Sequence, residues 1–131
     1  MKDFLLLEDG SLFPGRSVAA PGTACGEAVF TTAMSGYQEI ATDPSYAGQL
    51  VCFTAPMIGN YGVAPERDES DGVAARAVLM RKAGGEEWCA WLAERGVAAL
   101  EGVDTRSLVL ALRSAGAMRG AVVAGEADPD D

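Results

Sequence analysis

A serine, three cysteines and many carboxylates are the side chains of this sequence that could do chemistry. Ser45 follows an Asp-Pro pair at the start of a turn, where a hydroxyl is usually exposed and most often stabilises the turn itself. Cys52 lies inside the apolar run QLVCFT, where burial raises a thiol pKa and disfavours the nucleophilic thiolate. The chain contains no histidine, which excludes Ser-His-Asp and Cys-His catalysis. From the residues alone we predict no catalytic machinery.

Metal and phosphate chemistry are not indicated either. The three cysteines form no CxxC pair, and we interpret each as a reduced thiol acting as a small buried or half-buried apolar residue. The GNYG stretch lacks the Lys-Ser and the helix of a phosphate loop. Glu27, Glu39 and Asp43 could suggest acid–base pairs, but nineteen acids in 131 residues make chance proximity the better explanation. We therefore expect no metal site and no catalytic residue.

Charge and composition narrow the class of protein. The net charge of −9 argues against nucleic acid or an anionic membrane as a partner, because both need clustered lysine and arginine. A length of 131 residues with 49% hydrophobic content fits one globular domain with its own core. The N-terminus has too short an apolar stretch for a signal peptide, and no run approaches a membrane helix. We expect a soluble, cytoplasmic domain.

Strand signals occur along the whole chain. An Asp-Gly turn between apolar runs predicts an N-terminal hairpin. The run before Thr54 is apolar almost throughout, so we expect a central strand covered on both faces. Strands are predicted at residues 4–7, 12–13, 28–32, 49–54, 73–80, 97–100 and 117–125.

Helices are predicted at residues 37–41, 86–95 and 105–115. The first must stop at Asp43, because the residue before a proline is pushed out of the helical region. In the second, Trp88, Trp91 and Leu92 form one apolar stripe, which we interpret as core anchors rather than a ligand-stacking surface. The third has Asp104 as its N-cap. Its buried face is predicted to be Leu108, Ala111, Leu112 and Ala115.

Taken together, the elements predict an α/β (mixed α+β) layered domain with a largely antiparallel or mixed sheet. The segment 55–72 reads as a loop, and a structureless loop of that length in a compact domain is usually functional. On the residues alone the domain is a binding or interaction module.

Four stretches, LEDGSLFPG, GEAVFTTAMSGYQEIATDPSYAGQLVCFTAPMIGNYG, ERDES and GVDTRSLVLALRSAGAMRGAV, occur in a specific order and spacing. From Phe4 to Gly125 the sequence closely resembles the N-terminal domain of the small, glutamine-hydrolysing subunit of carbamoyl-phosphate synthase. The resemblance implies a three-layer β/β/α swivelling domain over residues 1–125. Residues 126–131 would then begin a linker to a glutaminase domain.

In this family the small subunit hydrolyses glutamine and passes ammonia to a large subunit, which builds carbamoyl phosphate for arginine and pyrimidine synthesis. The resemblance implies three partners: the large subunit, the C-terminal glutaminase domain of the same chain, and L-glutamine. It implies no cofactor in this chain, since ATP and Mg²⁺ act on the large subunit. The family's catalytic cysteine, histidine and glutamate are absent from this sequence, so we expect no glutamine hydrolysis by this polypeptide alone.

The resemblance assigns one substrate-binding residue. Ser45 matches the serine of the family's DPSY motif, which contributes to the glutamine site from the N-terminal side. The sequence departs from the family at Thr31 and Ala33, where asparagine and serine are usual. From its length and composition, the loop through Asn60 and Tyr61, with its acidic 66–71 cluster, is a candidate inter-subunit surface. A stand-alone interaction module descended from this domain is the alternative.

Overall fold

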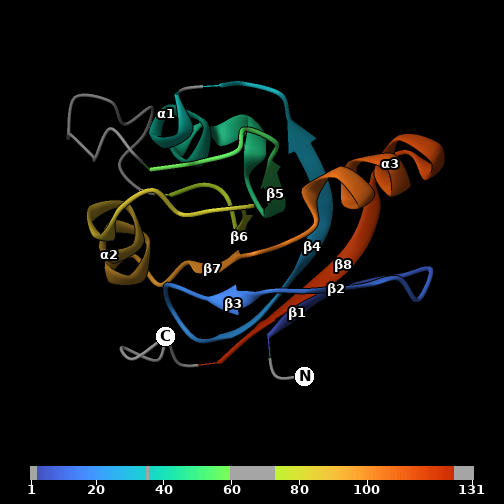
Figure 1. Ribbon diagram of the computed structural model, residues 1–131, viewed down its shortest axis with the longest axis horizontal. Helices are drawn as coiled ribbons and strands as arrows, with labels where there is room; N and C mark the ends of the chain where they lie inside the picture. The colour runs from blue at the N-terminus through green and yellow to red at the C-terminus, as the bar shows by residue number, and fades with distance from the viewer. Residues whose placement is uncertain (1–2, 35, 60–72, 126–131) are drawn as a thin grey trace.

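The computed structural model describes residues 3–34, 36–59 and 73–125. The strands are β1 (Phe4–Leu7), β2 (Leu12–Pro14), β3 (Arg16–Ser17), β4 (Gly22–Thr31), β5 (Gln49–Phe53), β6 (Ala77–Leu79), β7 (Ala98–Glu101) and β8 (Met118–Ala124). The helices are α1 (Tyr37–Thr42), the 3₁₀ turn η1 (Pro44–Tyr46), α2 (Glu86–Glu94) and α3 (Thr105–Ala115). Figure 1 shows their arrangement.

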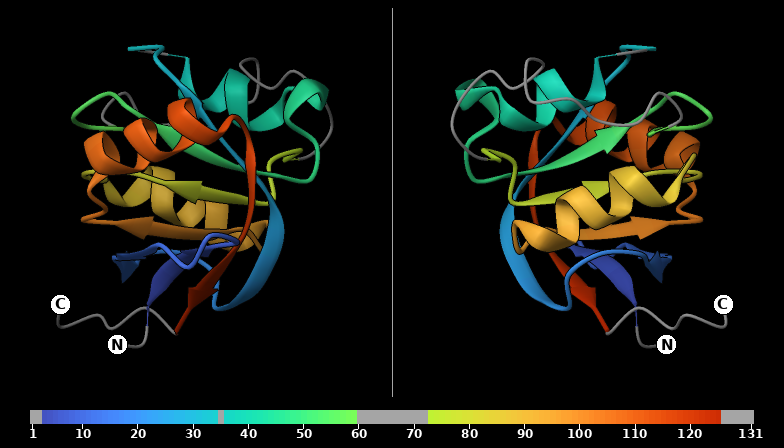
Figure 2. Two further views of the ribbon diagram at one scale, coloured as in Figure 1. Left: turned by 90° about the vertical axis from the view of Figure 1, so that its right-hand side faces the viewer. Right: turned by 90° about the vertical axis from the view of Figure 1, so that its left-hand side faces the viewer.

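All eight strands form one mixed sheet in the order β2-β1-β8-β4-β5-β6-β7-β3. The long strand β4 joins its two halves. Residues 22–28 of β4 pair antiparallel with β8, and residues 27–31 pair parallel with β5. The sheet curls along this strand, so the β1–β8 half lies across the β5–β7 half (Figures 1 and 2).

Two hydrophobic clusters divide the domain into layers. In β5, Leu50 and Cys52 belong to a cluster shared with β1, β8 and α3, while Val51 and Phe53 belong to a cluster shared with α1 and α2. All four side chains are at most 1% exposed, which confirms the prediction of a strand covered on both faces. The first cluster fills the space between the halves of the sheet and includes the buried side of α3, and the second lies under α1 and α2. The predicted mixed α+β class with β/β/α layering is confirmed.

The helical layer is held by aromatic side chains. Trp88 is fully buried, with Tyr37 edge-on to its ring at 4.7 Å and Trp91 stacked on it at 5.4 Å. Arg95 lies over the Trp91 ring at 4.4 Å and donates to the Trp91 carbonyl. Such aromatic pairs add to the free energy gained by burial. The prediction that both tryptophans are core anchors is confirmed.

Helix α3 begins as predicted, with an Asp104 carboxylate oxygen accepting from the backbone N–H of Ser107 at 3.1 Å. Leu108 and Leu112 are buried in the sheet cluster. The prediction for Ala115 is wrong, because this last residue of the helix is exposed.

Several strand predictions need correction. Strand β3 was not predicted, because two polar residues after a Pro-Gly pair carry no strand signal. Strand β4 starts at Gly22 rather than residue 28, since two glycines and a glutamate mask its first half. The strand predicted at 73–80 is paired only over Ala77–Leu79. The strand predicted at residues 12–13 runs one residue further, to Pro14, which is the last paired residue and lies opposite Phe4.

Asp3 ties the beginning and end of the described domain together. Its Oδ2 accepts from the N–H of Ser17 at 3.1 Å, and its Oδ1 accepts from the N–H of Gly125 at 2.6 Å. The N–H of Gly15 donates to its carbonyl at 3.1 Å. The residue is only 7% exposed, so this carboxylate is a buried link between β1, β3 and the end of β8.

Candidate functional site

Ser45 lies at the centre of a turn that its neighbours build. Asp43 ends α1 in an extended conformation, as its position before proline requires. The Asp43 Oδ1 then accepts from the backbone N–H of Ser45 at 2.9 Å, and its carbonyl accepts from Tyr46 at 3.0 Å. This Asx turn satisfies the backbone locally and leaves the Ser45 side chain exposed.

The turn contacts two other segments of the chain, at Ala74 and at Gly26. Gly48 closes it with φ 75° and donates its N–H to the Ala74 carbonyl at 3.1 Å. On the opposite side the Gly48 carbonyl lies so close to Gly26 of β4 that an added Cβ there would stand 2.3 Å from it. Arg76 donates its N–H to the Gln49 carbonyl at 2.8 Å, which continues the attachment into β5. Ser45 therefore stands on a turn that is fixed from both sides.

The inner side of the turn rests on the helical core. Thr42 is fully buried and its hydroxyl donates to the Gln38 carbonyl at 2.9 Å. Tyr46 packs partly buried against the cluster that contains Trp88. The exposed hydroxyl thus has a rigid base beneath it, which is what a residue that positions a ligand needs.

The chemistry open to Ser45 is hydrogen bonding. Within the described residues its hydroxyl has no hydrogen-bond partner, so it can both donate and accept toward a ligand. No histidine exists in the sequence to act as its base. The geometry fits a binding contact and offers nothing for nucleophilic attack.

The three cysteines differ in how far they are buried. Burial raises the pKa of Cys52 to about 12, as the sequence predicted for a thiol inside an apolar strand. Burial, with Glu101 and Glu86 nearby, also raises the pKa of Cys89. Cys25 is exposed on β4, which corrects the expectation that every cysteine would be at least half-buried. The two thiols with raised pKa values are held as protonated, unreactive groups.

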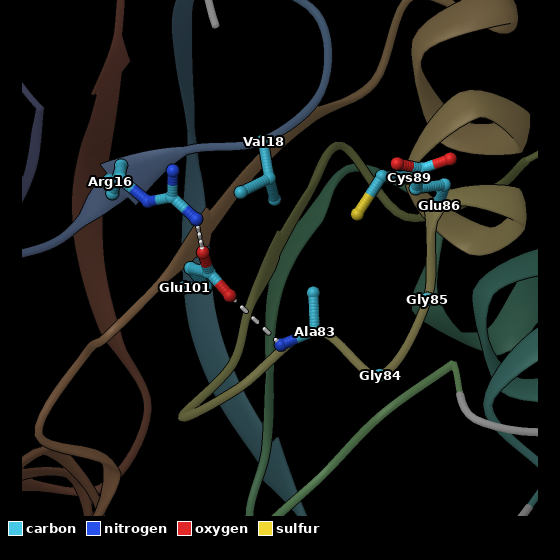
Figure 3. Close-up of a pocket in the computed structure, with 8 residues that line it drawn as sticks. All are labelled: Arg16, Val18, Ala83, Gly84, Gly85, Glu86, Cys89 and Glu101. Carbon is cyan, nitrogen blue, oxygen red and sulfur yellow. Dashed lines mark hydrogen bonds and ion pairs between the residues drawn. The ribbon is translucent and has the colours of Figure 1, made fainter. Parts of the chain in front are cut away.

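A hollow that no sequence pattern predicted lies beside β3, β7 and the start of α2 (Figure 3). Arg16 forms an ion pair with Glu101, whose other oxygen accepts from the Ala83 N–H at 3.1 Å. The Cys89 sulfur points into the same space. Because Glu101 already engages Arg16, and the Cys89 thiol is protonated, these groups fasten β3 to β7 and offer little to a ligand.

Thr31 and Ala33 lie where the ends of two strands are joined. The Thr31 hydroxyl accepts from the Ala33 N–H at 3.3 Å, and its carbonyl accepts from the N–H and the hydroxyl of Thr54. Threonine and alanine at these positions therefore leave the end of β4 attached to the end of β5.

Other sequence predictions lie outside the described residues. These are the loop through Asn60 and Tyr61, the acidic 66–71 cluster and the linker at 126–131. In the described part of the chain no helix has the length and apolar character needed to cross a membrane.

The structure thus defines a layered α+β domain with an exposed serine on a turn that other segments of the chain hold in place. Among solved structures, the aminopeptidase from Aneurinibacillus sp. strain AM-1 shares this fold, with a TM-score of 0.56 and 15% identity over 94% of this chain and 30% of that one. At that identity the likeness concerns the fold alone.

Sequence comparison defines the family. The family model for the carbamoyl-phosphate synthase small chain, CPSase domain, matches residues 5–122, so the chain belongs to this family. The carbamoyl phosphate synthase small chain of Maridesulfovibrio salexigens is 46% identical over 99% of this chain and 37% of its own length. Those of Thioalkalivibrio sulfidiphilus and Methanosarcina mazei are 50% and 44% identical over 95% and 100% of this chain. The chain spans little more than a third of these relatives, at 35% to 38% of their length.

Proposed function

We propose that this chain is the N-terminal domain of the glutaminase subunit of a carbamoyl-phosphate synthase. In this proposal the complete enzyme takes ammonia from glutamine for carbamoyl phosphate synthesis, which feeds arginine and pyrimidine production. The domain docks a large subunit and abuts a glutaminase domain, and it does not hydrolyse glutamine by itself. The family membership supports the enzyme class.

The observation that carries the proposal for this domain is the Ser45 turn. Its hydroxyl is exposed, has no hydrogen-bond partner among the described residues, and stands on backbone fixed by Asp43 and by the Gly26–Gly48 contact. A hydroxyl held in this way can hydrogen-bond the amino or carboxylate group of glutamine bound on a neighbouring domain. The domain would then complete a substrate site whose reacting groups lie elsewhere.

Replacing Ser45 by alanine in the complete enzyme tests this role. Loss of one hydrogen bond to a bound substrate should raise the KM for glutamine about 2- to 10-fold, because such a bond is worth roughly 0.5–1.5 kcal/mol. Synthesis from added ammonia should keep its wild-type rate, since ammonia bypasses the glutamine site. Equal loss of both activities would refute the assignment.

Ser11→Ala is a matched control. Ser11 also donates its backbone N–H to the aspartate two residues earlier, at 2.8 Å to Asp9 Oδ1, but it lies in the β1–β2 hairpin. Both activities should be unchanged in this variant. If Ser11→Ala raised the glutamine KM as much as Ser45→Ala does, the effect would be general and not a contact with glutamine.

A further inference from the structure

Helix α3 presents an unpartnered stripe on its outer face. Arg106, Leu110 and Arg113 are spaced i, i+4, i+7, which places them on one side of the helix. All three are exposed, and Leu110 is 57% exposed although it is a large apolar residue. The opposite side of the helix, with Leu108 and Leu112, is buried in the sheet core.

This stripe forms one wall of a groove at the carboxyl ends of β4 and β5. The other wall is made by Thr32 and Thr54, which directly follow β4 and β5. Figure 1 shows α3 lying beside the arrowhead of β4. We call this surface the α3 groove; its lining residues are Thr32, Thr54, Thr105, Arg106, Val109, Leu110 and Arg113.

The α3 groove is basic on an acidic protein. Its lining contains two arginines and no carboxylate, whereas the whole chain carries a net charge of −9. The acid nearest in sequence, Asp104, accepts from both the N–H and the hydroxyl of Ser107. Asp104 is close enough to Arg106 for their charges to interact, but neither Arg106 nor Arg113 forms an ion pair in the described part of the chain. Two such guanidinium groups favour a ligand that brings its own carboxylates.

Further exposed apolar side chains follow the same strand ends. Met34 is 67% exposed and comes three residues after β4, and Met57 is 40% exposed and comes four residues after β5. In the described residues the only other exposed large apolar side chains are Leu6 and Leu12, which pair across β1 and β2. Methionine and arginine are both enriched at protein interfaces.

We propose that the α3 groove receives a segment of the partner subunit in which an apolar side chain packs beside Leu110 and flanking carboxylates pair with Arg106 and Arg113. The inference rests on the proposed function, because it takes the large subunit as that partner. The groove lies at the carboxyl end of β5 and Ser45 lies at its amino end, roughly 17 Å away along the strand. The domain would thus contact glutamine near the amino end of β5 and the large subunit near its carboxyl end.

The test measures affinity between the complete small subunit and the large subunit of the same organism. Leu110→Glu removes the apolar contact, and Arg106→Gln with Arg113→Gln removes the charge. Glutamate and glutamine form helices well, so α3 should remain folded, which circular dichroism will check. Leu12→Glu and Arg119→Gln are matched controls, since these residues are exposed on β2 and β8 and do not line the α3 groove.

We expect Leu110→Glu to weaken association about tenfold or more, as loss of a central apolar contact does. The double arginine variant should slow association and flatten its salt dependence between about 0.05 M and about 0.5 M salt. If both variants bind with wild-type affinity while the wild-type complex assembles and uses glutamine, the α3 groove is not the docking site. The proposed function would still stand. Failure of the wild-type subunits to associate would overturn the proposed function. Loss of self-association alone would also overturn the inference, because the occupant would then be a second copy.

Discussion

Replacing Gly26 by alanine should displace the Ser45 turn without touching Ser45. The new Cβ would stand 2.3 Å from the Gly48 carbonyl oxygen, whereas real Cβ contacts stay beyond 3.0 Å. The backbone on one side must therefore move by about 0.7 Å. Because the obstacle is a carbonyl and not a flexible side chain, no rotamer change can relieve it.

The direction of that movement follows from what surrounds Gly48. Strand β4 is paired on both sides, with β8 and with β5, so it resists displacement. The turn yields instead, which strains the 3.1 Å hydrogen bond from Gly48 to Ala74. Overpacking of this kind costs about 1–3 kcal/mol of stability. A substrate contact misplaced by this much should lower kcat/KM for glutamine by up to about 2- to 10-fold, the loss expected when the Ser45 hydrogen bond is removed altogether.

The assay compares glutamine-dependent and ammonia-dependent synthesis by the complete enzyme. Gly120→Ala is the matched control, because Gly120 is the register partner of Gly26 and its added Cβ would stand 2.9 Å from the Leu6 carbonyl. That variant should lose stability while keeping its glutamine KM. If Gly26→Ala unfolds at a lower temperature yet uses glutamine normally, the turn does not position a glutamine contact and the reasoning is wrong.

Three further predictions concern the described residues. Asp3→Ala should destabilise the domain by about 1–3 kcal/mol, because it leaves the buried N–H of Ser17 unpaired and removes the partner of the part-buried N–H of Gly125; urea unfolding followed by tryptophan fluorescence measures this, and an unchanged midpoint would contradict the link. Hydrogen bonds from Ser107 lower the pKa of Asp104 below its ordinary 3.8, so the carboxylate stabilises α3 above that pH and loses this effect as the pH falls through the lowered pKa. Asp104→Ala should therefore lower the melting temperature at pH 7, and the gap from wild type should close in strong acid; a gap independent of pH would refute the cap. A thiol reagent at about pH 8 should label Cys25 in the native protein and Cys52 only after unfolding, because a pKa of about 12 leaves on the order of one thiolate in 10,000; labelling of both at the same rate, mapped by mass spectrometry, would contradict this.

The elements that local chemistry specifies could be predicted from the sequence. The Asp-Gly hairpin, the stop at Asp43, the Asp104 cap and the tryptophan stripe each depend on residues within four positions of one another, and the structure has all of them. The apolar run of β5 predicted burial on both faces for the same reason. Sequence patterns predict such features because the interacting residues lie close together in the sequence.

The features that were missed depend on contacts between distant residues. Nothing near Gly26 reveals that it lies in a strand, since glycine weakens strand propensity and its reason for being there is a carbonyl 22 residues later. The ion pair that fastens β3 joins Arg16 to Glu101 across 85 positions. A helix that ends at Ala115 leaves that residue exposed even though the periodicity puts it on the buried face. Each of these outcomes is decided by packing, which no local pattern contains.

Ser45 shows the same limit at the level of function. Local rules predict an exposed serine whose hydroxyl stabilises the turn, but in the structure the Asp43 carboxylate does this by accepting from the backbone N–H of Ser45. The contacts that hold the turn in place distinguish Ser45 from an ordinary turn serine. Gly48 lies against Gly26 of β4 and donates its N–H to the Ala74 carbonyl, and Tyr46 packs against the helical core. A turn needed only to reverse the chain would not require a strand glycine for its close approach. The cost of glycine inside β4 is therefore the physical argument that supports the proposed contact between Ser45 and glutamine.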